Sequence, residues 1–369
     1  MRAVVLTARF LFSANYLKVC YNKPYKTKTE DIMDYSQILS QQFNIKEEYA
    51  KNIITLLDDG NTIPFIARYR KEMHGSMDDQ LIREFAEKLE YLRGLDKRRD
   101  EIRSLIDAQE KLTDEINLAL DKAATLSELE DIYRPYRPKR KTRASIAKEK
   151  GLEPLANDIL KQEKGFDPSK SAVDYIDEEK GVTSVEDAIQ GAMDIIAELV
   201  SDNAEIRKRI RNLTNANGVL VSVATDEEKD SVYKNYYDYK EPVKKIAGHR
   251  VLAVNRGEKE GFLKVSVETD SEKPLNSIFR AMITDKNQLC SDIIREACTD
   301  AYQRLIYPSI EREVRNDLTD VAAENAMKVF AVNLKQLLMQ PPVKGKTVLA
   351  LDPGYRTGCK TAVVDSTGK

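Results

Sequence analysis

Hydrophobic residues recur every three to four positions from about residue 38 onwards, which is the spacing of one buried helix face. The first such stripe ends at Gly60, and Pro64 opens a second helix that is expected to reach Glu72. Capping residues at 76–79 begin a long helix, and its buried face comprises Leu81, Phe85, Leu89, Leu92, Ile102, Leu105 and Ile106. Further helices are expected near 114–122, 128–133, 144–150, 184–200 and from 203, and Ser184 is expected to cap the helix at 184–200. The pattern predicts a mainly α-helical chain.

The period changes after residue 218. Residues 219–224 are rich in β-branched side chains and predict a short strand. Residues 250–255 and 262–267 flank a polar loop with two glycines, which predicts a small β-hairpin. Helical periodicity returns at 275–307 and 310–338, divided at Pro308, and two strands are expected at 347–351 and 359–365.

A basic strip at residues 133–143 interrupts the helical pattern, because Pro135 and Pro138 cannot lie inside one continuous helix. Its cations are Arg134, Arg137, Lys139, Arg140, Lys141 and Arg143, and its aromatic residues are Tyr133 and Tyr136. Arginine can pair with phosphate in a bidentate manner, and aromatic rings stack on unpaired bases. The strip is therefore a candidate nucleic-acid contact. The alternative is a linker whose cations meet acidic helices of the same chain and whose tyrosines pack.

Two smaller basic clusters comprise Arg68, Arg70 and Lys71, and Arg207, Lys208, Arg209 and Arg211. Arg68 and Lys71 are three apart, and Arg207 and Arg211 are four apart, so each pair is expected to share one helix face. Each face is either a secondary nucleic-acid contact or a solvated surface with ion pairs to neighbours.

Composition limits the other function classes. The chain has 369 residues, enough for two or three domains, and its net charge of −2 means that any basic surface is local. The two histidines, His74 and His249, are too few for a histidine-rich metal site, and His74 is expected in an exposed loop. No phosphate-loop or dinucleotide motif occurs, so we expect no metal and no cofactor.

The cellular setting is also indicated by composition. Four cysteines without metal spacing suggest a reducing compartment, and no apolar run is long enough to span a membrane. Residues 1–29 contain no acid and resemble a transit peptide or a poor signal sequence. We favour an upstream extension, with Met33 as the true start.

Asp352 follows a buried-strand pattern and precedes Pro353-Gly354. An aspartate there anchors Mg²⁺ in ribonuclease H-like folds and approaches phosphate in sugar-kinase and actin-like folds. Asp365 is the only other acid in the segment, so Asp352 is a weak catalytic candidate and a plain hairpin is favoured.

Several longer strings carry a specific resemblance. IPFIARYRKE at 63–72, LEDIYRPYRPKRKTRA at 129–144, GLEPLA at 151–156, YYDY at 236–239, HRVLA at 249–253 with RGE at 256–258, and LDPGYRTGCK at 351–360 occur in one order along the chain. Together they resemble the Tex family of bacterial transcription accessory proteins.

The resemblance implies a multi-helical N-terminal region with helix-turn-helix-like elements, followed by the first strands of a YqgF or ribonuclease H-like α/β domain. We therefore expect an extension at 1–32, a helical domain with the basic strip at 33–225, a hairpin plus long helices at 226–342, and the beginning of the YqgF-like domain at 343–369. The resemblance further implies a cytoplasmic protein that binds RNA or another single-stranded nucleic acid and meets the transcription or translation machinery.

Three functions stay open at this point. The first is a non-catalytic RNA-binding scaffold, which is not an enzyme. The second is a protein-interaction or architectural helical scaffold. The third is the remnant of a ribonuclease H-like nuclease, which would cleave in a Mg²⁺-dependent manner that Asp352→Asn abolishes.

Overall fold

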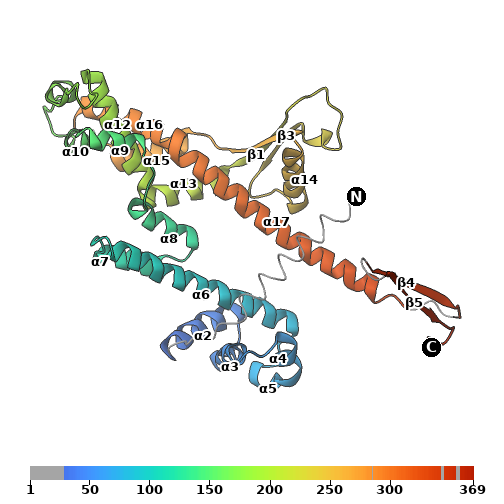
Figure 1. Ribbon diagram of the computed structural model, residues 1–369. Coiled ribbons are helices and arrows are strands. Elements are labelled where there is room, and N and C mark those ends of the chain that lie inside the picture. The colour runs from blue at the N-terminus through green and yellow to red at the C-terminus, as the bar shows by residue number, and fades with distance from the viewer. Residues whose placement is uncertain (1–28, 285, 342–344, 355–357) are drawn as a thin grey trace. The chain divides into compact units, whose positions relative to one another are not determined.

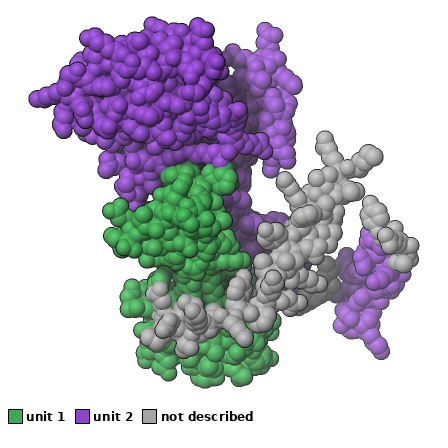
Figure 2. All heavy atoms as spheres, turned by 60° about the vertical axis from the view of Figure 1, so that its left-hand side comes forward, with its two compact units in different colours: residues 1–138 green, residues 139–369 purple. Residues whose placement is uncertain are grey.

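Helices dominate the computed structural model, which describes residues 29–284, 286–341, 345–354 and 358–369 (Figure 1). The chain divides into two compact units, residues 1–138 and residues 139–369 (Figure 2). The predicted mainly α fold class is confirmed. The expectations for residues 1–28 lie outside the described residues.

The first unit is built around one long helix, α6 (Asp79–Asp107), and Asp78 caps it by accepting a hydrogen bond from the Leu81 amide. The other elements of this unit are α2 (Thr29–Phe43), α3 (Glu47–Asp58), α4 (Ile63–Tyr69), α5 (Lys71–His74), α7 (Asp114–Lys122), α8 (Leu126–Tyr133) and the 3-10 turn η1 (Arg134–Tyr136). The first half of α6 packs on α2, α3 and α4, and Phe85 and Ile82 are fully buried there. Its second half forms a separate core with α7 and α8 around Ile102 and Leu120.

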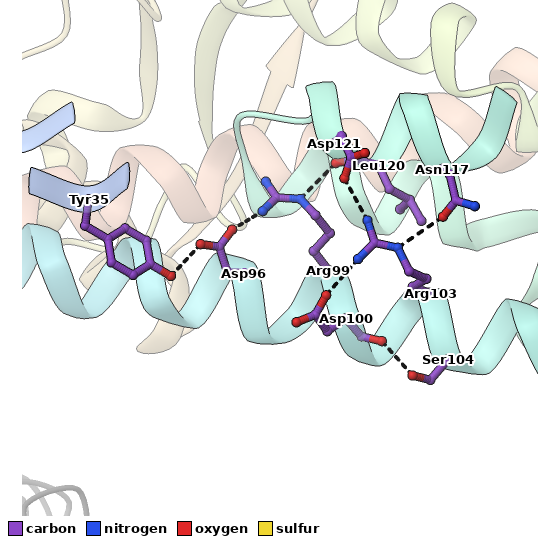
Figure 3. A network of polar contacts seen from close by, with 9 residues as sticks. All are labelled: Tyr35, Asp96, Arg99, Asp100, Arg103, Ser104, Asn117, Leu120 and Asp121. Atoms are coloured by element: carbon purple, nitrogen blue, oxygen red, sulfur yellow. Dashed lines mark hydrogen bonds and ion pairs between the residues drawn. The ribbon is translucent and has the colours of Figure 1, made fainter. Parts of the chain in front are cut away.

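Two arginines on α6 hold α7 against it (Figure 3). Arg99 donates from Nε to the Leu120 carbonyl at 2.9 Å and from Nη2 to the Ala123 carbonyl at 3.0 Å. Arg103 donates to Asn117 Oδ1 at 3.1 Å and to Asp121 Oδ1 at 2.7 Å. Arg99 therefore pairs the Ala123 carbonyl at the C-terminal end of α7 and shares the Leu120 carbonyl with the Ala123 amide, which donates to it at 3.3 Å.

The second unit is centred on α12 (Val185–Asp202), which Ser184 caps as predicted by accepting from the Asp187 amide. Ile195, Ile196 and Val200 of α12 are buried in one core that extends from Ala144 to Val314. The surrounding helices are α9 (Arg143–Glu149), α10 (Glu153–Lys161), α11 (Pro168–Ala172), η2 (Val173–Tyr175), α13 (Ala204–Asn217), α15 (Glu272–Met282) and α16 (Gln288–Asp300). This core runs across the boundary expected at residue 225.

A three-stranded antiparallel sheet covers part of the second unit, in the order β2–β1–β3. Its strands are β1 (Val219–Ala224), β2 (Asp238–Pro242) and β3 (Leu263–Glu268), with the 3-10 turn η3 (Lys234–Tyr236) preceding β2. In the registers, Ser222 faces Tyr239 on one side and Val265 on the other.

The hairpin predicted from 250–255 and 262–267 is wrong in its first arm. Residues Gly248–Lys259 form helix α14, which buries Val251, Val254 and Gly257 at three-residue spacing and packs on β3. The second arm does form a strand, but β3 pairs with the central strand β1 rather than with the segment that precedes it in sequence.

The expected division at Pro308 is also wrong. Helix α16 continues through a π-helical turn, η4 (Ala301–Ile306), into α17 (Tyr307–Leu338), where Pro308 lies in the first turn. A proline has no amide hydrogen to donate, and inside a helix its ring clashes with the carbonyl four residues earlier. The wider π-helical turn before Pro308 accommodates the ring, so the helix continues without a break.

The two C-terminal strands form as predicted. β4 (Val348–Gly354) and β5 (Gly358–Val364) pair antiparallel, with Asp352 opposite Lys360. All described residues of β4 are exposed.

Candidate nucleic-acid interface

The tyrosines of the basic strip belong to a core. Tyr133, the last residue of α8, is only 5% exposed and lies in the second core of the first unit. Tyr136 is half-buried and packs on the same core, while its carbonyl accepts from Gln109 Nε2 at 2.9 Å. This placement agrees with the packing alternative, because the Tyr133 ring is not available to stack on a base.

The first two cations of the strip differ in accessibility. Arg134 is half-buried and interacts with other groups of the chain. Arg137 leaves η1 in an extended conformation between Tyr136 and Pro138, and it is exposed. Within the described part of the chain, Arg137 forms no ion pair.

An acidic line on α12 engages the other end of the strip. Asp194, Glu198 and Asp202 follow one another at four-residue spacing, which places them on one helix face. Lys139 Nζ lies 3.4 Å from Glu198 Oε1 and also contacts the Asp202 carboxylate. Thr142 Oγ1 donates to Glu198 Oε1 at 3.1 Å. Lys139 is therefore paired within its own unit, as the linker alternative requires.

Asp194, the first acid of this line, lies near two arginines. Burial raises the pKa of Asp194, while the guanidinium groups of Arg304 and Arg143 act in the opposite direction. Arg304 Nη2 is 3.4 Å from Asp194 Oδ1. Arg143 thus lies near an acid, although its side chain remains exposed.

Three strip cations in the second unit stay accessible. Arg140, Lys141 and Arg143 are exposed, and Lys141 has only a 3.5 Å contact between two exposed groups, with Glu149. Exposed pairs of this kind contribute little free energy and exchange readily with solvent. Arg137, Arg140, Lys141 and Arg143 are therefore the cations available to an external phosphate.

The cluster at Arg207 and Arg211 has a structural role. Arg207 is 2% exposed and donates from Nη2 to Ser309 Oγ at 3.0 Å. Arg211 Nε lies 2.6 Å from Glu313 Oε1. Both side chains join α13 to α17. Arg211 forms the ion pair to a neighbouring helix that the second alternative expects, whereas Arg207 is buried and does not lie on a solvated surface.

The cluster at Arg68 and Lys71 is arranged differently from the prediction. The expected single helix to Glu72 is wrong, because α4 ends at Tyr69 and Arg70 (φ −129°, ψ 34°) leaves the helical region before α5 begins. We call residues 63–75 the α4–α5 corner. Arg68, Arg70 and Lys71 are exposed, and among the described residues none of them forms an ion pair. The Arg70 guanidinium carbon lies 5.3 Å from the ring centre of Phe65.

The α4–α5 corner is held from behind by buried groups. His74 is fully buried, not exposed in a loop as expected, and its Nε2 lies 3.1 Å from the Ile66 carbonyl. Asn52 Nδ2 donates to the Met73 carbonyl at 3.0 Å. Gly75 ends α5 at φ 66°, where a side chain would collide with the Tyr49 ring.

Sequence reasoning missed Tyr69 as a member of this basic surface. Tyr69 is 64% exposed, and its ring centre is 5.4 Å from that of Phe65. The signal was present in the alternation of aromatic and basic residues at 65–71, but a continuous helix would have spread these residues around its circumference.

Asp352 and Asp365 do not come together in the C-terminal hairpin. In the strand register, Asp352 lies opposite Lys360. Asp365 follows the last register pair, Val348–Val364, and its carboxylate accepts hydrogen bonds from the Thr367 and Lys369 amides. Because a strand rises about 3.3 Å per residue, the two carboxylates lie roughly 15 Å apart along the hairpin. Among the described residues, no cluster of three potential metal-ligating side chains occurs. Nor does any described helix have the length and apolar character needed to cross a membrane.

Three Tex domain families match successive segments of the chain. Residues 33–107 match the Tex-like protein N-terminal domain, 163–330 match the Tex central region-like family, and 346–369 match the Tex protein YqgF-like domain. The expectation that the C-terminal part of the chain is YqgF-like is thereby confirmed, with residues 346–369 matched.

Individual relatives agree with these matches. The chain is 46% identical to "Uncharacterized protein YdcI" of Bacillus subtilis, over 91% of the chain and 48% of that protein. It is 38% identical to "Transcriptional accessory protein Tex" of Neisseria gonorrhoeae, over 91% of the chain and 45% of the relative. It is 32% identical to human "S1 RNA-binding domain-containing protein 1", over 93% of the chain and 36% of the relative. The chain spans about half the length, or less, of these curated relatives. With three Tex domain families matched in sequence order and similarity of this extent, the chain belongs to the Tex family.

Proposed function

We propose that this chain is a non-catalytic scaffold that binds single-stranded RNA, and that it acts in transcription or RNA metabolism in the cytoplasm. The observation that carries the proposal is the accessible part of the basic strip, where Arg137, Arg140, Lys141 and Arg143 lie exposed within seven consecutive residues. The names of two relatives also support a role in transcription and RNA binding, since one is called a transcriptional accessory protein and the other an S1 RNA-binding domain-containing protein.

The physical basis is electrostatic. Exposed guanidinium and ammonium groups neutralise phosphates and release condensed counterions, which makes affinity fall steeply with salt. Arginine adds bidentate hydrogen bonds to phosphate oxygens. With Tyr133 buried, the strip contributes phosphate contacts and supplies no Tyr133 stacking platform.

The architectural alternative is favoured by different contacts. Lys139 pairs with Glu198 and Asp202, and Arg211 pairs with Glu313, so part of the basic content stabilises the second unit. The two functions make opposite predictions for the same substitutions.

The test compares a quadruple Arg/Lys→Gln variant of Arg137, Arg140, Lys141 and Arg143 with the single variant Lys139→Gln, in titrations of a fluorescent single-stranded RNA at several salt concentrations. We expect the quadruple variant to flatten the slope of log affinity against log salt by about 3, since each phosphate contact with a single strand contributes about 0.7. Its melting temperature is expected to stay near that of the parent chain.

The matched control separates binding from stability. Lys139→Gln should lower the stability of the second unit by about 0.5–1 kcal/mol and leave RNA affinity nearly unchanged, because its ammonium group is already paired. The proposal fails if the parent chain binds no RNA at low salt. A lowered melting temperature with unchanged binding in the quadruple variant would establish the architectural alternative.

A further inference from the structure

Building on the RNA binding proposed above, we propose that the α4–α5 corner is a second contact for single-stranded RNA, in which a nucleobase stacks on Tyr69 while Arg68, Arg70 and Lys71 meet the flanking phosphates. No part of the basic strip belongs to this corner, so the two contacts can be removed separately.

The exposure of Tyr69 is the first observation. A tyrosine ring is usually at least half-buried because its apolar face is costly to leave in water. Tyr69 is 64% exposed, and its only ring contact among the described residues is with Phe65. A large aromatic surface therefore remains open on the last residue of α4.

Charge is the second observation. Three cations and one carboxylate, Glu72, lie at 68–72, so this short segment carries a charge of about +2 in a chain whose net charge is −2. Two other arginines of this unit are neutralised by acids, in the Arg93–Asp58 and Arg98–Glu130 pairs. The three cations of the corner lack such partners within the described ranges.

The rigidity of the supporting structure is the third observation. Ile66 is fully buried, and the contact between His74 Nε2 and its carbonyl ties α5 to α4 across the break at Arg70. The break turns Arg70 over Phe65 and brings Lys71 onto a new helix. Open aromatic surface flanked by cations that have no acidic partner is the arrangement that binds single strands through stacking and phosphate contacts.

The absence of tryptophan from the chain provides a direct reporter. In Tyr69→Trp the new indole is the only one, and stacking on a base quenches its fluorescence. The matched control is Tyr91→Trp on α6. Tyr91 is 44% exposed, with Lys88 Nζ 4.8 Å from its ring centre, but Glu87 and Glu90 precede it by four residues and one residue.

The experiment titrates both variants of the full chain with oligoadenylate RNA, with an abasic strand of equal charge, and with polyphosphate. We expect oligoadenylate alone to quench the indole of Tyr69→Trp in a saturable manner, and no ligand to quench the indole of Tyr91→Trp. In the tyrosine background, Tyr69→Ala is expected to weaken oligoadenylate binding about tenfold, and the triple Arg68, Arg70 and Lys71→Gln variant to flatten the salt slope by about 2.

Each result discriminates. RNA binding by Tyr69→Trp without a change in its indole fluorescence overturns the corner contact and leaves the proposed function standing. Equal responses to the abasic strand or polyphosphate overturn stacking. No binding of oligoadenylate by the parent chain overturns both proposals. Quenching that persists when the quadruple strip substitutions are added to Tyr69→Trp, at reduced affinity, supports two separate contacts.

Discussion

Two glycines occupy helical positions whose surroundings differ. Gly94 lies inside α6, and a Cβ atom placed there would meet no heavy atom within 4 Å. Gly257 lies inside α14, where a Cβ atom would come within 2.5 Å of Leu263 Cδ1 and 3.1 Å of Tyr233 Cγ. The first glycine is a cost to its helix, whereas the second is required by close packing of α14 on the sheet.

Substitution by alanine should therefore have opposite effects at the two sites. Gly94→Ala is expected to raise the free energy of unfolding by about 0.5–1 kcal/mol, because alanine restricts the unfolded chain without a clash. Gly257→Ala is expected to lower it by about 1–3 kcal/mol through overpacking. Urea unfolding followed by circular dichroism measures both, and a loss of stability in Gly94→Ala would contradict the open environment described for that position.

At the scale of elements, arginine side chains determine how short helices attach to long ones. α7 has only nine residues, and a helix of that length is marginal in water by itself. The guanidinium group of Arg99 donates to two carbonyls at the C-terminal end of α7, those of Leu120 and Ala123. The Arg99 side chain is only 16% exposed. Arg103 makes its contacts to α7 nearer to solvent, since Asp121 is largely exposed.

We expect Arg99→Lys to lower the free energy of unfolding of the first unit by about 1–3 kcal/mol, because one ammonium group cannot reproduce the planar fork and leaves a buried carbonyl unpaired. Arg103→Lys should cost about 0.5 kcal/mol or less, since its ion pairs are exposed. Thermal unfolding of both variants provides the comparison. Equal losses in the two variants would mean that the carbonyl contacts of Arg99 add nothing to its charge.

Element prediction succeeded where the information is local. The capped helices at Asp78 and Ser184 were predicted correctly, since a cap residue and its helix are neighbours in sequence. The segment 250–255 was misassigned because its β-branched and apolar residues favour a strand locally, whereas its burial is decided by β3 and α17. The break at Arg70 was missed because Pro64 gave a start signal but nothing at 70 gave a stop signal.

At the scale of the whole molecule, the parts of the chain differ in how much core supports them. α12 is buried within the large core of the second unit, whereas the β4–β5 hairpin exposes all described residues of β4, including Leu349 and Leu351. An isolated two-stranded hairpin is marginal in water.

Hydrogen exchange of this 369-residue chain should reveal the contrast. Amides of the hairpin, such as those of Ala350 and Ala362, are expected to exchange close to the unprotected rate, while amides of α12 are protected to the level of global unfolding. Mass spectrometry of peptides covering 346–369 and 185–202 makes the comparison. Protection of the hairpin comparable to that of α12 would show that its exposed apolar side chains are covered in solution.

The sequence by itself determined the helical class, most helix starts and the membership suggested by its long motifs, because periodicity, caps and motifs are contained in neighbouring residues. It also placed the cations that any phosphate contact would use. Only the tertiary structure decided which of them are free: the acidic line of α12 takes Lys139, α17 takes Arg207 and Arg211, and Tyr133 enters a core. These outcomes depend on residues tens to a hundred positions away. The open aromatic and basic surface at Tyr69 likewise emerged only once α4 was seen to end there.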